Sequence, residues 1–63
     1  MELKIKFKSG QELVTFPTKV EFINWPVKAL FVYHGTKKDQ YDLITITSYI
    51  IYNNEDELSY ELE

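Results

Sequence analysis

The two ends of the chain share one alternating pattern but carry opposite charges. In residues 3–8 large apolar side chains alternate with lysines, and in residues 58–63 leucine and tyrosine alternate with serine and glutamate. Successive side chains of a β-strand point to opposite faces, so each end predicts a strand with one apolar and one polar face. We expect the two end segments to be neighbours in one sheet, with lysines beside glutamates and both apolar faces in one core. The charged residues concerned are Lys4, Lys6, Lys8, Glu61 and Glu63.

The length of 63 residues allows one domain at most, and we expect residues 1–63 to form a single small β domain. A chain this short buries only about 60% of the surface that it exposes when unfolded. Because cysteine is absent, disulfides cannot add stability. The remaining sources are a core of large side chains, favoured by the ten aromatic residues, and association with a partner subunit.

Short alternating segments separated by turn residues cover the first half of the chain. Residues 2–8 and 13–16 predict a hairpin turned at Gly10. Residues 19–23 (KVEFI) predict a third strand, and Trp25 before a proline predicts a bend. Residues 27–33 (VKALFVY) are apolar on both faces, which predicts a central strand covered on both sides.

The second half begins with residues 35–40 (GTKKDQ), whose composition predicts a polar loop. Residues 41–53 predict a long strand in which Ile44 and Ile46 share a face. The alternation then slips, which predicts a bulge, a tight bend or a 3₁₀ turn near Ser48.

The tail, residues 55–62, is compatible with a last strand and also with a short helix, of which we favour the strand. These elements predict an all-β fold of five to six mostly antiparallel strands. The arrangement expected is a small SH3-like or partly open barrel or sandwich, with room for one short helix or 3₁₀ turn. We expect the four phenylalanines, Phe7, Phe16, Phe22 and Phe31, to lie in its core.

The opening strand and its glycine turn, with the sequence FKSG at residues 7–10, resemble those of small uncharacterised all-β proteins of low-GC bacteria and their phages. The many lysine, isoleucine, tyrosine and asparagine residues, which have AT-rich codons, fit such a source. The resemblance implies an all-β fold and possible phage origin, and it implies no activity.

Catalytic residues are scarce. A nucleophile needs a base to activate it, and the only histidine is His34. Neither a nucleophile elbow nor metal-ligand spacing is present, so we expect no enzyme, no cofactor and no metal site. With no signal peptide and no apolar stretch near 20 residues, a cytoplasmic location is expected.

Binding to another protein, or to a second copy in a homo-oligomer, is the leading hypothesis. Aromatic rings with polar tips are enriched at interfaces, and residues 53–63 carry five carboxylates and no lysine. A more specific version is an acidic inhibitor that imitates DNA phosphates. The residues expected to contact a partner are Trp25, Tyr33, Tyr49, Tyr52, Glu55, Asp56 and Glu57.

The alternative is a small β-barrel that binds nucleic acid through the lysine stripe Lys4, Lys6 and Lys8. Lys37 and Lys38 extend the stripe in this hypothesis. The absence of arginine and the net charge of −3 count against it, because nucleic-acid binders are usually basic over their footprint.

Overall fold

The computed structural model describes residues 1–53 and 56–61, the last six of them as backbone. This part of the chain forms seven strands and one 3₁₀ turn. They are β1 (Glu2–Phe7), β2 (Glu12–Thr15), β3 (Lys19–Ile23), β4 (Ala29–His34), β5 (Lys37–Asp42), η1 (Leu43–Thr45), β6 (Ile46–Asn53) and β7 (Asp56–Glu61). No helix in the described residues is long or apolar enough to cross a membrane.

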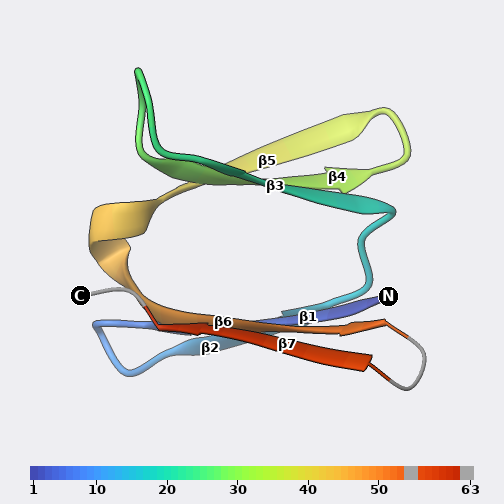
Figure 1. Cartoon of the computed structure of the whole chain (residues 1–63), viewed down its shortest axis with the longest axis horizontal. Helices are drawn as coiled ribbons and strands as arrows, with labels where there is room; N and C mark the ends of the chain where they lie inside the picture. The colour runs from blue at the N-terminus through green and yellow to red at the C-terminus, as the bar shows by residue number, and fades with distance from the viewer. Residues whose placement is uncertain (54–55, 62–63) are drawn as a thin grey trace.

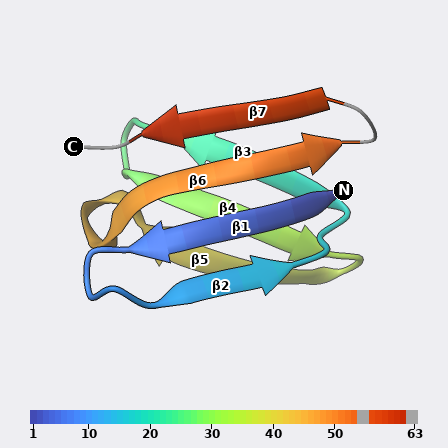
Figure 2. The same ribbon diagram turned by 90° about the horizontal axis from the view of Figure 1, so that it is seen from below.

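The strands form two antiparallel sheets that face each other as two layers (Figure 1). One sheet has the order β2-β1-β6-β7 and the other the order β3-β4-β5. Figure 2 shows that the strands of the two layers cross at an angle and that β2 and β7 form the edges of the larger sheet. The predicted all-β, partly open architecture is confirmed, with one strand more than expected.

The first hairpin lies where the sequence predicts it. The N–H of Gly10 donates to the carbonyl of Phe7, and the N–H of Phe7 donates to the carbonyl of Gln11, both at 2.9 Å. Gly10 has φ +95°, a conformation that side-chain-bearing residues rarely adopt. The turn between β1 and β2 therefore depends on glycine at this position.

The two end strands lie in one sheet, as predicted, but they are not neighbours. Strand β6 lies between β1 and β7 and pairs with both. Lys4 instead meets Glu12 of β2, with 3.5 Å between the ammonium nitrogen and the carboxylate. In β1 the alternation assigns the faces correctly, with Leu3 and Ile5 buried, but it carries no information about which strand comes between two others, and the predicted direct pairing is wrong.

Residues 35–40 are not the predicted polar loop. Gly35 and Thr36 form a tight turn, and β5 returns beside β4 from Lys37. The sequence of β5 is polar because it is the edge strand of a small sheet whose outer face meets solvent. Pairing with the apolar β4 outweighs its low β-propensity.

The predicted irregularity before Ser48 is present. The β1–β6 register changes between the pairs Lys6–Ser48 and Phe7–Ile46, so Thr47 is an extra residue in β6. The 3₁₀ turn η1 comes just before it and carries the chain from one sheet to the other (Figure 1). As a result Ile46 is buried and Ile44 exposed, so the prediction that they share a face is wrong.

The core lies between the sheets and is made of aliphatic side chains and one tyrosine ring. Its buried residues are Leu3, Ile5, Ala29, Leu30, Val32, Ile46 and Tyr49. The predicted phenylalanine core is wrong for Phe16, which is 69% exposed, and for Phe22, whose ring stacks on Tyr49 but stays largely exposed. Phe7 packs against the core, and Phe31 is half-buried on the outer face. The expectation that β4 is covered on both sides is therefore also wrong.

Candidate functional site

Three chain connections meet at one end of the sandwich, which we call the pocket end. They are the β1–β2 turn (residues 8–11), the β3–β4 connection (residues 24–28) and η1 (Figure 1). The N–H of Lys8 donates to the carbonyl of Thr45 at 2.9 Å, and the N–H of Leu43 donates to the carbonyl of Lys28 at 3.1 Å. These two bonds fix η1 between the other two connections.

Large apolar side chains are exposed on these connections. Trp25 is 85% exposed and Val27 48%, both in the β3–β4 connection, where the Trp25–Pro26 peptide is cis. Ile44, at the middle of η1, is 77% exposed. Single exposed apolar residues are ordinary, but several on adjoining connections at one end of a domain mark a surface suited to binding.

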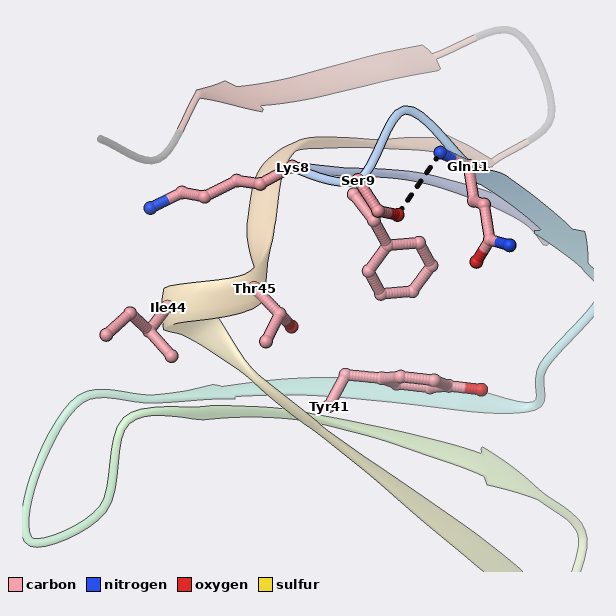
Figure 3. Close-up of a pocket in the computed structure, with 7 residues that line it drawn as sticks. Lys8, Ser9, Gln11, Tyr41, Ile44 and Thr45 are labelled. Atoms are coloured by element: carbon pink, nitrogen blue, oxygen red, sulfur yellow. Dashed lines mark hydrogen bonds between the residues drawn. The ribbon is translucent and has the colours of Figure 1, made fainter.

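A pocket of about 520 Å³ opens beside Ile44 (Figure 3). The rings of Phe7 and Tyr41 line it, one from each sheet, with centroids 5.8 Å apart and planes inclined by 53°. The other lining residues are Lys8, Ser9, Gln11, Ile44 and Thr45. The volume lies within the range of roughly 300–1,000 Å³ typical of ligand sites.

Most polar side chains of the pocket can both donate and accept hydrogen bonds, and among them the Lys8 ammonium only donates. Lys8 and Gln11 approach it from the β1–β2 turn, and Figure 3 shows the Tyr41 hydroxyl and the Gln11 amide on one side of the view, with Lys8 on the other. Burial, and next the charge of Asp39, raise the pKa of Tyr41, so its phenol remains a neutral donor at physiological pH.

The opposite end of the sandwich is tied by side-chain hydrogen bonds. Thr15 Oγ1 lies 2.7 Å from His34 Nε2, and Asp39 Oδ2 lies 3.8 Å from His34 Nδ1. We call these three residues the His34 clamp. Their order, hydroxyl, imidazole and carboxylate, matches that of a nucleophile and its base. The nearby N–H of Gly35 donates to Thr18 Oγ1 at 3.1 Å, and the Thr18 hydroxyl donates to the Tyr33 carbonyl. The clamp thus has an evident structural role in joining the two sheets.

The aromatic residues predicted to bind a partner do not form one surface. Trp25 lies at the pocket end, whereas Tyr33 lies on the outer face of β4, where its hydroxyl donates to Glu21. Tyr52 lies in β6 of the other sheet, paired with Glu2. Tyr49 is 3% exposed and belongs to the core, so its ring is not accessible to a partner. The partner-binding roles of Trp25, Tyr33 and Tyr52 stay predictions.

The predicted acidic contacts are placed only in part. Glu55 lies outside the described residues. Asp56 and Glu57 open β7, in register with Asn53 and Tyr52. This confirms the strand preferred for the tail, and the role of these carboxylates stays a prediction.

The lysine stripe is divided between two places. Lys4 and Lys6 line a groove of about 210 Å³ with Glu12 on the outer face of the larger sheet, whereas Lys8 lines the apolar pocket. Lys38 lies on the other sheet, with its ammonium group 4.5 Å from the centre of the Phe31 ring. Nucleic-acid binding through Lys4, Lys6 and Lys8 stays a prediction.

Comparison with known proteins finds no matching family model, no matching curated protein and no matching solved structure. The function has to be inferred from the site itself. Sequence reasoning missed Phe7, Tyr41 and Ile44 as parts of one pocket, because a hairpin turn and a 3₁₀ turn far apart in the sequence create it. The available signals were the FKSG turn and the irregularity before Ser48.

Proposed function

We propose that this chain is a non-enzymatic protein-interaction module that binds another protein through its pocket end. The observation that carries the proposal is the exposure of Ile44, which lines an apolar pocket, and of Trp25 and Val27 on the β3–β4 connection, which is hydrogen-bonded to η1. Tryptophan is among the residues that contribute most at interfaces, particularly when a flanking pocket takes up part of the partner.

The scaffold supports this use of the connections. The β1–β2 and β3–β4 pairs keep a regular register, and the His34 clamp ties the end opposite the pocket. Loops presented by a rigid sandwich are common sites of recognition because they vary in side chain without altering the core. A partner that covers Trp25 and Ile44 would remove apolar surface from water, which favours association by about 25 cal/mol per Å² before the costs of binding.

Site-specific photo-crosslinking tests the proposal. Replacement of Trp25 by p-benzoylphenylalanine places a photoreactive group at the pocket end, and the same replacement of Phe16 is the matched control. Phe16 is 69% exposed but lies after β2, at the opposite end. We expect the photoreactive group at position 25 to form a covalent adduct with the partner protein, and Ile44→Ser to lower the yield of that adduct. The group at position 16 should form no such adduct.

Sedimentation of the purified protein distinguishes a second copy from another protein as the partner. A concentration-dependent dimer that Trp25→Ala and Ile44→Ser abolish would identify self-association. Equal adducts from positions 16 and 25, unaffected by Ile44→Ser, would refute the pocket end as the binding surface.

A further inference from the structure

The proposed function does not say which chemical groups of the partner are bound. The residues that line the pocket indicate which groups fit there. Resting on that function, we propose that the pocket takes an apolar side chain flanked by carboxylates, from an extended acidic segment of the partner protein. Two independent features carry this inference: the apolar floor formed by the Phe7 and Tyr41 rings, and the presence of a lysine with no carboxylate among the lining residues.

The floor suits an apolar group of the size of a leucine or phenylalanine side chain. The Phe7 and Tyr41 rings come from facing sheets and both line the pocket. A side chain that enters the pocket can therefore contact both rings. Their tilted arrangement leaves faces and edges exposed to a third ring, a geometry that aromatic clusters favour. Ile44 adds an exposed aliphatic wall.

Among the lining residues Lys8 alone carries a charge and none carries a carboxylate, and Figure 3 shows the Lys8 side chain extending to the rim on the Ile44 side, away from Tyr41. The Lys8 ammonium offers donors only, whereas the Tyr41 hydroxyl and the Gln11 amide can donate to a carboxylate or accept from another group. Within residues 1–53 no ion pair involves Lys8, unlike Lys4, which Glu12 engages at 3.5 Å. A ligand that brings carboxylate oxygens beside its apolar group complements this lining in charge and in hydrogen bonding.

The charges around the pocket are consistent with the same partner. Lys28 belongs to the adjoining β3–β4 connection and adds a second positive charge. Asp42 precedes η1 and is exposed, and its backbone carbonyl accepts a hydrogen bond from Thr45. The charge of Asp39 contributes to raising the pKa of Tyr41, and Asp39 Oδ2 lies 3.8 Å from His34 Nδ1. Neither aspartate lines the pocket.

Nuclear magnetic resonance titration of the full chain with three blocked tripeptides tests the inference. The probes are acetyl-Glu-Phe-Glu-amide, acetyl-Gln-Phe-Gln-amide and acetyl-Glu-Ala-Glu-amide. We expect the first to shift the amide signals of Phe7, Lys8 and Thr45. The neutral peptide should bind about three- to fivefold more weakly, as expected for exposed charge contacts. The alanine peptide should bind about tenfold more weakly or not measurably, because it lacks the ring that the floor takes up.

Lys8→Gln should remove the preference for the acidic peptide without abolishing binding. Lys37→Gln is the matched control, since Lys37 is exposed and begins β5 at the opposite end. Equal affinity for the acidic and neutral peptides, with shifts still at the pocket, would overturn the acidic partner while leaving the proposed interaction surface intact. Shifts confined to the Lys4 and Lys6 groove, or no shifts at all, would also overturn it. Crosslinking at position 25 reports separately on the proposed function.

Discussion

Thr15 of β2 and His34 of β4 join the two sheets through a 2.7 Å hydrogen bond between Oγ1 and Nε2. The bond crosses the interior at the end opposite the pocket, where Asp39 lies on the other side of the imidazole. At the other end the sheets are joined by η1, and the pocket lies there between the β1–β2 turn and β5.

Thr15→Val tests the clamp, because valine keeps the shape of threonine but removes its hydroxyl. The change leaves the imidazole nitrogen without its partner, so we expect the free energy of unfolding to fall by about 0.5–1.5 kcal/mol. Urea denaturation measures the loss. Thr47→Val is the control, since Thr47 is an exposed residue of β6 and its replacement should change stability by less than about 0.5 kcal/mol. Equal effects of the two changes would show that the hydrogen bond adds nothing.

Matched valine substitutions of Ile44 and Ile46, two positions apart, test whether the irregularity before Ser48 places these side chains in different environments. Ile46 is 0% exposed and Ile44 is 77% exposed. Ile46→Val should therefore lower the free energy of unfolding by about 0.5–1.5 kcal/mol, because it removes a buried methylene group. Ile44→Val should leave it nearly unchanged. If both substitutions lowered the free energy of unfolding by similar amounts in denaturant titrations, the two side chains would share a buried face, as simple alternation predicts.

The parts of the fold that the sequence predicted are those set by local pattern. Gly10 between two alternating segments identified the first hairpin, and the adjacent isoleucines after Ser48 identified a break in register. Strand β5 was missed because its residues are polar, and only its pairing with β4 makes it a strand. The order of strands was missed because β6 enters between β1 and β7 for tertiary reasons that alternation does not record.

The candidate site was less predictable than the fold. Trp25 was identified by its residue type, and the structure does expose it. Tyr49 has the same polar tip as Tyr33, yet the extra residue Thr47 turns it into the core. The pocket depends on contacts between the β1–β2 turn and β5, which lie about half the chain apart, so no local pattern could reveal it.

The partner of Lys4 can be identified by charge reversal. The Lys4–Glu12 pair is exposed, so a double-mutant cycle with Lys4→Glu and Glu12→Lys should give a favourable coupling of about 0.2–1 kcal/mol. Because β6 separates β1 from β7, the corresponding cycle with Glu61→Lys should give a smaller coupling. Strands two positions apart are separated by roughly 10 Å, about one Debye length at 0.1 M salt. A larger coupling with Glu61 than with Glu12 would contradict the strand order.

The ionisation of Tyr33 gives a site-specific readout of the outer face of β4. The hydrogen bond to Glu21 raises the pKa of Tyr33 above its usual value of about 10, and desolvation and the charge of Glu21 add to the effect. Glu21→Gln should therefore lower the pKa of Tyr33, since the ammonium groups of Lys19 and Lys38 near the same ring favour the phenolate. The pKa is measured by following the ring-carbon resonances of Tyr33 by nuclear magnetic resonance as the pH is raised. The Tyr33→Phe variant assigns these resonances.

Glu12→Gln is the matched control for this titration, because Glu12 pairs with Lys4 on the other sheet and should leave the pKa of Tyr33 unchanged. A pKa that is higher in the folded than in the unfolded state means that the folded protein holds its proton more tightly. The stabilising contribution is therefore complete below pH 10 and is lost as the pH rises through the folded pKa. We expect Glu21→Gln to reduce the decline of stability above pH 10. An unchanged Tyr33 titration in this variant would show that Glu21 does not hold the phenol in its neutral form.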